Sequence, residues 1–173
     1  MGAWQHITVG STWDGAPARP GEVAEVALAL EGDELLVTVE APFHDDPAPP
    51  GEGGATDGLW EFEVVEVFVL GPDARYTEIE LGPHGHHLVL RLHGVRRPVE
   101  SGLAIDYVAV HNGPRWRGMA RVPVAALPPR PWRLNAYAIH GVGAARRYLV
   151  ATALGGDAPD FHRLDGFTLE ATL

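Results

Sequence analysis

The sequence predicts an all-β protein, an antiparallel β-sandwich of the jelly-roll-like type, with about ten to eleven strands and at most one or two short helices. Two observations support this class. Hydrophobic and polar residues alternate with a period of two along much of the chain, as they do in half-buried strands. The 173 residues include 21 glycines and 15 prolines, which suits many short strands joined by tight turns. Since no linker divides the chain, we expect one domain over residues 1–173.

The alternating segments are bounded by turn residues and define the strands in order. The predicted strands cover residues 25–30, 34–40, 60–70, 76–81, 87–92, 103–110, 116–122, 132–140, 147–153 and 166–172. The best short helix runs from Val122 to Leu127, where Pro128-Pro129 stops it. Residues 44–59 form a loop rich in Asp, Pro and Gly, and loops of this length often carry function.

Alternation also assigns side chains to the two faces of the central three-stranded meander. The aliphatic sets are expected to face the core, and they comprise Val65, Val67, Val69, Ile79, Leu81, Leu88, Leu90 and Leu92. The opposite face is then expected to carry Glu66, Phe68, Tyr76, Glu78, Glu80, His87, Val89 and Arg91. Such a face is either a polar binding surface or a solvated sheet face with cross-strand ion pairs, and both interpretations remain open.

Composition excludes several classes of function. The formal net charge of −10 disfavours nucleic acid and anionic membranes as partners. Cysteine is absent, which removes thiol nucleophiles and thiolate metal sites. We find no phosphate-binding loop, no dinucleotide fingerprint and no serine-nucleophile motif, so we expect no cofactor and no catalytic residues, and an enzyme is the less favoured class. The amino terminus lacks the pattern of a signal peptide, so we expect a cytoplasmic protein.

Several motifs resemble the family 9 carbohydrate-binding modules and the wider DOMON-like group. They are the strand Val65-Glu66-Val67-Phe68-Val69, Tyr76-x-Glu78, the turn with Pro83 and Gly85, Trp132-x-x-Asn135, and the closing segment from Phe161 to Phe167. This resemblance implies a β-sandwich fold and a carbohydrate or other polar small molecule as ligand.

A second resemblance covers nearly the whole chain and points to a small uncharacterised protein family with bacterial and animal members. It rests on Thr12-Trp13-Asp14-Gly15, Ala41-Pro42-Phe43, Leu59-Trp60, Glu63-Val64-Val65-Glu66, the segment from Pro83 to Leu90, Ala138-Ile139-His140-Gly141 and Pro159-Asp160-Phe161-His162. It supports the same fold and does not name an activity.

We therefore expect a ligand-binding module whose site lies where the face of Glu66 meets the loop 44–59 and the turn 82–87. The expected ligand-binding residues are Trp60, Glu66, Glu78, His84, His87, Arg91 and His140. One alternative is a metal-assisted enzyme in which His84, His87, His140 or His162 joins Glu66 around an ion. Because no recognised ligand spacing is present, we expect no metal site. Another alternative is an interaction domain without a small-molecule ligand. The sequence does not indicate the oligomeric state.

Overall fold

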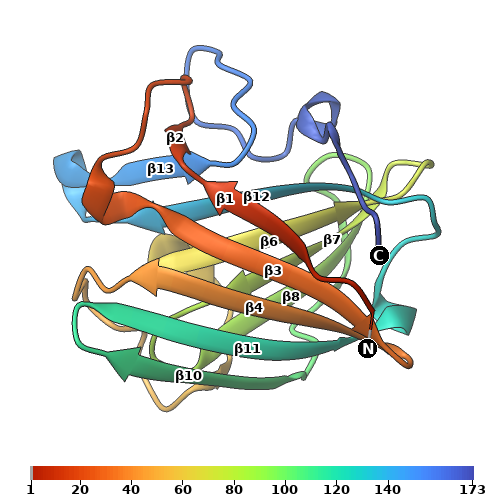
Figure 1. Ribbon diagram of the computed structural model, residues 1–173, viewed down its shortest axis with the longest axis horizontal. Coiled ribbons are helices and arrows are strands. Elements are labelled where there is room, and N and C mark those ends of the chain that lie inside the picture. The colour runs from red at the N-terminus through yellow and green to blue at the C-terminus, as the bar shows by residue number, and fades with distance from the viewer. Residues whose placement is uncertain (1) are drawn as a thin grey trace.

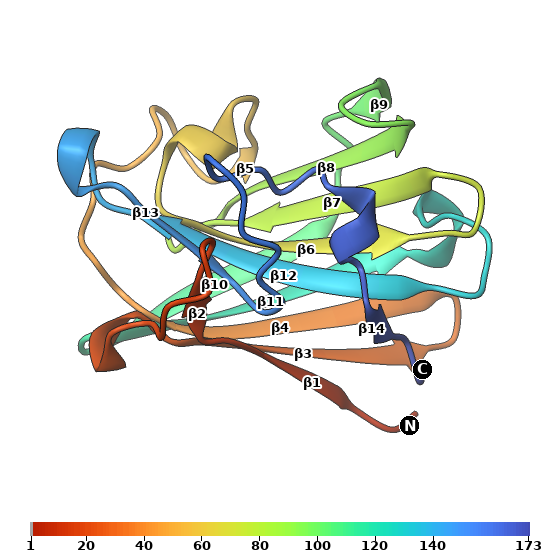
Figure 2. The same cartoon turned by 90° about the horizontal axis from the view of Figure 1, so that it is seen from above.

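The computed structural model describes residues 2–173 and contains two β-sheets that pack face to face (Figures 1 and 2). The smaller sheet has five antiparallel strands in the order β1-β3-β4-β11-β10. Their bounds are β1 Gln5–Val9, β3 Ala24–Glu31, β4 Glu34–Pro42, β11 Arg115–Pro123 and β10 Asp106–Asn112. The alternation of Val26, Leu28 and Leu30 along β3 explains why one face of this sheet is apolar.

The larger sheet has nine strands, with β2-β13-β12-β6-β7-β8-β5 as its main path, while β14 pairs with β12 and β9 pairs with β8. The long strands are β6 Val64–Leu70, β7 Arg75–Leu81, β8 His86–His93 and β12 Arg133–His140. The short strands are β2 Ser11–Thr12, β5 Gly54–Ala55, β9 Pro98–Ser101, β13 Arg147–Val150 and β14 Leu169–Glu170. The all-β sandwich class is therefore confirmed, with fourteen strands in the described chain.

Helical structure in residues 2–173 is limited to five single 3-10 turns. They are η1 Pro20–Glu22, η2 Leu59–Glu61, η3 Val124–Ala126, η4 Gly143–Ala145 and η5 Leu164–Gly166. The predicted helix from Val122 to Leu127 is reduced to η3, because β11 continues through Pro123 and Pro128 blocks extension at the other end. Within residues 2–173 we find no helix with the length and apolarity to cross a membrane.

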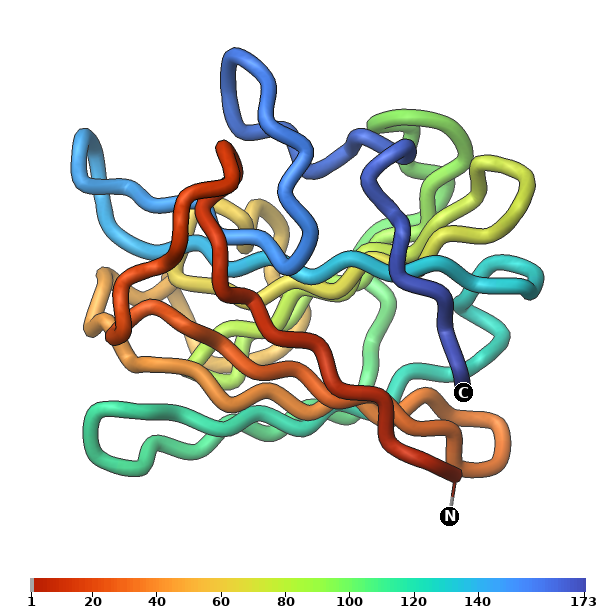
Figure 3. The backbone as a smooth tube through the Cα atoms, turned by 45° about the horizontal axis from the view of Figure 1, so that its top comes forward, coloured from red at the N-terminus to blue at the C-terminus, as the bar shows by residue number. Residues whose placement is uncertain are grey.

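Two hydrophobic clusters lie on opposite faces of the larger sheet. The main core lies between the sheets and includes Val65, Val67, Val69, Trp116 and Trp132. A second cluster covers the outer face of the larger sheet and includes Phe68, Tyr76, Leu88, Tyr137 and Phe167. Chain segments around residues 94–98, 141–146 and 151–167 gather on one side of the molecule in Figure 3. The outer face is therefore a covered surface rather than a solvated one.

The predicted facing of β8 is wrong. Ile79 pairs with Val89 and Glu80 pairs with Leu88, and paired residues of neighbouring strands point to the same side. Leu88, Leu90 and Leu92 are therefore buried in the outer cluster, beside the glutamates. His87, Val89 and Arg91 lie on the side of the main core instead. The prediction assigned all aliphatic side chains to the core between the two sheets. The larger sheet, however, buries apolar side chains on both of its faces.

Candidate functional site

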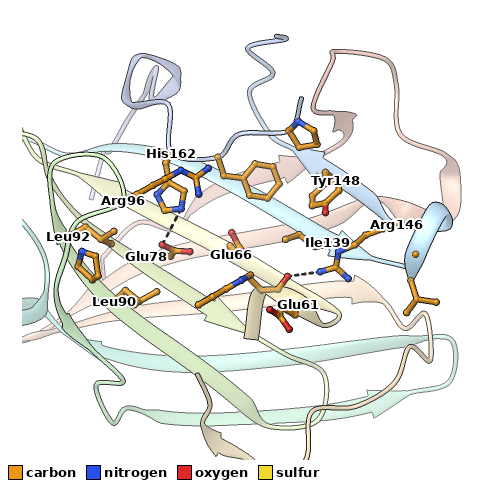
Figure 4. A pocket seen from close by; sticks show the side chains of 16 residues that line it. Glu61, Glu66, Glu78, Leu90, Leu92, Arg96, Ile139, Arg146, Tyr148 and His162 are labelled. Carbon is orange, nitrogen blue, oxygen red and sulfur yellow. Dashed lines mark hydrogen bonds and ion pairs between the residues drawn. The ribbon is translucent and has the colours of Figure 1, made fainter. Parts of the chain in front are cut away.

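A pocket of about 710 Å³ lies on the outer face of the larger sheet (Figure 4). Its floor comes from β6, β7, β8 and β12, through Glu66, Glu78, Leu90, Leu92 and Ile139. Its walls come from η2, from the segments around Arg96 and Arg146, and from Pro159 to His162. The volume falls within the range of small-molecule sites, and the lining combines apolar groups with a few convergent charges, as such sites do.

The floor contains carboxylates that the strand register brings together. Glu66 of β6 pairs directly with Glu80 of β7, and Glu78 lies two residues from Glu80 on the same face. The exposed fractions of Glu66, Glu78 and Glu80 are 2%, 4% and 0%. One carboxylate oxygen from each residue lies within 4.8 Å of the others. Three acidic groups thus share one buried location at the base of the pocket.

Burial controls the ionisation of these carboxyl groups. Desolvation raises the pKa of Glu78 to about 7. Desolvation, followed by the charge of Glu78, raises the pKa of Glu66 well above its usual value, and desolvation with the neighbouring glutamates does the same for Glu80. Arg146 opposes the shift at Glu66 and Arg96 opposes it at Glu78. Because these pKa values are raised, carboxyl groups of the cluster are protonated near neutral pH when no metal cation is bound.

Aromatic rings line the upper part of the pocket. Trp60 in η2 lines the pocket and exposes 42% of its surface, and Tyr148 of β13 also lines the pocket. Phe161 stacks on Tyr137 with ring centroids 4.0 Å apart, and the Tyr137 hydroxyl donates a hydrogen bond of 3.0 Å to the carbonyl of Phe161. The ring of Phe161 is thereby held against the sheet. An exposed indole above carboxylates offers both an apolar surface and hydrogen-bond acceptors.

A network around His162 fixes the wall beside Glu78. The backbone N–H of Arg96 donates to the Tyr76 hydroxyl at 3.1 Å, and this hydroxyl lies 2.7 Å from Nδ1 of His162. Burial lowers the pKa of His162 to about 4, so the ring is neutral near pH 7. The Tyr76 hydroxyl and Nδ1 share a hydrogen bond whose direction depends on the tautomer of the ring. Nε2 lies 3.9 Å from Glu78 Oε2.

Arg146 connects two walls of the pocket. Its guanidinium donates to the carbonyl oxygens of Trp60 and Gly141, at 2.5 Å and 3.1 Å, and lies 5.8 Å from the centre of the Tyr148 ring. Figure 4 shows Arg146 directed toward the turn that carries Glu61. Arg146 therefore positions the main chain of the turn that carries the exposed indole.

The structure brings together three of the seven expected ligand-binding residues, namely Trp60, Glu66 and Glu78. His87 faces Tyr107 of the smaller sheet, with ring centroids 6.0 Å apart, and Arg91 pairs with Glu100 at 2.8 Å. These two residues lie away from the pocket because of the corrected β8 facing.

His84 and His140 also lie elsewhere. His84 packs near Phe43 and His111, with ring centroids 5.6 Å and 5.4 Å away. His140 stacks on His44 at 3.6 Å, and its Nε2 lies 3.2 Å from Glu22. His84, His87, His140 and His162 thus occupy separate environments, and the structure does not assemble the histidine metal site considered from the sequence.

Five residues of the pocket were not among the expected ligand-binding residues, although His162 was considered as a metal ligand. They are Arg96, Arg146, Tyr148, Phe161 and His162. The two arginines lie outside the predicted strands, and Tyr148 belongs to the ordinary alternation of the predicted strand 147–153. A signal did exist for Phe161 and His162, because both lie in the closing motif that carried the family resemblance. Only tertiary structure shows that this motif covers the outer face of β6 and β7.

The fold is a β-sandwich of the carbohydrate-binding-module type. The chain is similar to a candidate carbohydrate-binding protein from Bacteroides uniformis, with a TM-score of 0.74, 20% identity, and coverage of 98% of this chain and 86% of that one. It is also similar to a family 9 carbohydrate-binding module from Caldicellulosiruptor kristjanssonii in complex with cellotriose, with a TM-score of 0.52, 12% identity, and coverage of 87% and 73%. The same kind of module in complex with glucose gives a TM-score of 0.52 and 12% identity, with coverage of 87% and 74%.

Sequence relatives define the family. A mouse protein, "UPF0462 protein C4orf33 homolog", is 39% identical over 165 residues, which cover 90% of this chain and 85% of the relative. The zebrafish homologue is 36% identical over 176 residues, with coverage of 94% and 88%, and the human protein is 36% identical over 165 residues, with coverage of 90% and 82%. The chain belongs to the UPF0462 family. No family model matches it.

Proposed function

We propose that this protein is a ligand-binding module whose pocket holds a saccharide or a related hydroxyl-rich small molecule. The observation that carries the proposal is the exposed ring of Trp60 beside the buried carboxylates Glu66 and Glu78 in one pocket. A sugar ring presents an apolar C–H face together with several hydroxyl groups. An indole packs against the former, and carboxyl oxygens accept hydrogen bonds from the latter.

The charges of the pocket support a polar ligand over an apolar one. Arg96 and Arg146 lie in the walls, opposite the acidic floor, so donors and acceptors converge from two directions. Leu90, Leu92 and Ile139 also line the pocket, so a ligand would bury apolar surface as well. The similar family 9 modules, which were solved with cellotriose and glucose, are in keeping with this ligand class.

A ligand screen tests the proposal. The melting temperature of the wild-type protein would be measured with neutral mono- and oligosaccharides, sugar phosphates and sugar acids, and each hit would be titrated by calorimetry. We expect at least one compound to raise the melting temperature in a saturable way and to bind with one site per chain. If no compound of these classes binds at millimolar concentration, the proposal fails.

Acid–base catalysis is a second candidate function, favoured by one observation. Glu78 and Glu66 are neighbouring carboxyl groups with raised pKa values inside a pocket, and such pairs serve as proton donors and acceptors in enzymes. Incubation of each hit with the protein, followed by NMR, separates the two functions. Unchanged ligand after prolonged incubation supports a binding module, whereas a product that forms in excess of the protein supports catalysis.

A further inference from the structure

The glutamate cluster at the base of the pocket lacks the partners that buried carboxylates normally require. Glu66, Glu78 and Glu80 are all at least nine-tenths buried. Neither side-chain oxygen of Glu80 accepts a hydrogen bond from outside the cluster, and its carboxyl group bonds to that of Glu78 only when one of the two is protonated. One of its oxygens lies within 4.8 Å of a carboxylate oxygen of Glu66 and of Glu78. Burial of a carboxyl group without such a partner destabilises the fold. The site is therefore suited to a ligand that coordinates carboxylate oxygen atoms.

The surrounding cations do not neutralise the cluster by direct contact. Arg96 forms its ion pair with Asp160 at 2.8 Å, and Arg146 donates to main-chain carbonyls. The one ion pair of residues 2–173 that reaches the cluster joins His162 Nε2 to Glu78 Oε2 at 3.9 Å, and this ring is neutral near pH 7. Three carboxylates therefore converge without a bound positive group from the described chain.

We propose that Glu66, Glu78 and Glu80 together bind a divalent cation at the base of the pocket. Three carboxylates without nitrogen or sulfur ligands select a hard, oxygen-preferring ion such as Ca²⁺, Mg²⁺ or Mn²⁺ over zinc or copper. Oxygens on opposite sides of one Ca²⁺ are separated by up to about 5 Å, since each bond is about 2.3–2.6 Å long. The corresponding separation for Mg²⁺ is only about 4 Å. One oxygen from each glutamate lies within 4.8 Å of the others, so a single Ca²⁺ can contact all three residues.

The position of the cluster gives the cation a role in ligand binding. Glu66 and Glu78 line the pocket, while Glu80 does not. A cation held by all three would have its remaining coordination positions directed toward the pocket. Vicinal hydroxyl or carboxylate oxygens of a ligand would complete its coordination shell below the ring of Trp60. This part of the inference rests on the proposed function, whereas cation binding itself does not.

Titration of metal-free protein with CaCl₂, MgCl₂ and MnCl₂ by calorimetry tests the cation site. We expect one Ca²⁺ per chain and binding at least tenfold weaker in Glu80→Gln, which keeps the shape and removes a charge without altering a pocket-lining residue. Glu66→Gln provides a second variant should Glu80→Gln fail to fold in EDTA. Glu63→Gln is the matched control, because Glu63 is also buried, has its pKa raised to about 7, and accepts hydrogen bonds from His44 and Asp46 away from the cluster.

The outcomes separate this inference from the proposed function. Absence of binding by all three ions at millimolar concentration overturns the cation site, as does binding that Glu80→Gln and Glu66→Gln both leave unchanged. Saccharide binding that persists in EDTA, together with absent cation binding, rejects the cation and leaves the proposed function standing. Cation binding that requires Glu80, with no saccharide bound in its presence, supports the cation site and rejects the saccharide.

Discussion

Glu66 and Glu80 are direct cross-strand neighbours on the covered face of the larger sheet, and neither side chain is in contact with a positively charged group of residues 2–173. Like charges in this position ordinarily destabilise a sheet, and burial makes the penalty larger. The arrangement differs from the ion-pair ladder considered from the sequence, because Arg91 pairs with Glu100 instead. The pair is therefore better explained by a function of the pocket than by stability.

The corrected facing of β8 leads to a prediction on Leu90 and Val89. Each variant, Leu90→Ala and Val89→Ala, is expected to lower the free energy of unfolding by about 2 kcal/mol or more, because both side chains are buried. Only Leu90 lines the pocket, so only Leu90→Ala is expected to weaken ligand binding. Urea unfolding and calorimetry on both variants provide the measurements. Weaker binding in Val89→Ala with unchanged binding in Leu90→Ala would show that the facing is inverted.

Glu22 is expected to make the stability of the fold depend on pH, with stability lost in acid. Arg147 donates two hydrogen bonds to its carboxylate, at 2.7 Å and 2.9 Å, and this contact lowers the pKa of Glu22 to about 2. Its folded pKa lies below the ordinary value of 4.5, so its contribution is present above pH 4.5 and is lost as the pH falls toward 2. The contribution is about 1–3 kcal/mol, because the Arg147 guanidinium is partly exposed and water screens the ion pair.

Unfolding of wild type and Glu22→Gln between pH 2 and 7 tests this contribution. The difference in stability is expected to be largest near pH 7 and to shrink steadily below pH 4.5. Glu40→Gln is the control, because Glu40 forms its ion pairs with Arg115 and Arg117 at the surface and is expected to contribute less than about 1 kcal/mol. A difference for Glu22→Gln that does not change with pH would contradict the assigned role.

Trp60 is expected to contribute to ligand binding through its exposed ring. Trp60→Ala removes the apolar surface at the rim and should weaken binding of a screened saccharide by at least tenfold, with little change in melting temperature. Trp4→Ala is a matched control, since Trp4 is exposed to a similar degree, 39% against 42%, and does not line the pocket. Equal affinity of the two variants in calorimetry would remove Trp60 from the site.

Sequence alone predicted the sandwich because alternation and turn residues are local signals. The strands around Val67 and Ile79 were found correctly, and their valine and isoleucine side chains lie in the main core as expected. The short strands β2, β5 and β9 and the edge strand β1 were missed, since segments of two to five residues carry too few side chains for a periodic pattern. β14 lies within the strand predicted over residues 166–172 but is shorter. The helix from Val122 to Leu127 was overestimated because propensity does not record where a strand ends.

The site was predicted only in part for a related reason. Glu66 was detectable because it is a charged residue within an otherwise apolar strand, and Glu78 followed from the same alternation. The predicted facing of His87 and Arg91 assumed that one face of the sheet is buried in the core and the other is exposed to solvent. The closing segment with Phe161 covers the second face, and this long-range packing leaves no local trace in β8. Arg96 and Arg146 join the pocket through loops whose course the sequence does not define.

Binding of a screened saccharide to wild type and to Glu66→Gln is the most direct test of the pocket as a ligand-binding site. Calorimetric titration of both proteins, with Glu63→Gln as a buried control, would be combined with thermal melts. We expect Glu66→Gln to lose affinity by more than tenfold and to keep or raise its melting temperature, because a buried carboxylate without an ion-pair partner is replaced by a neutral side chain. Unchanged affinity in Glu66→Gln would contradict the account.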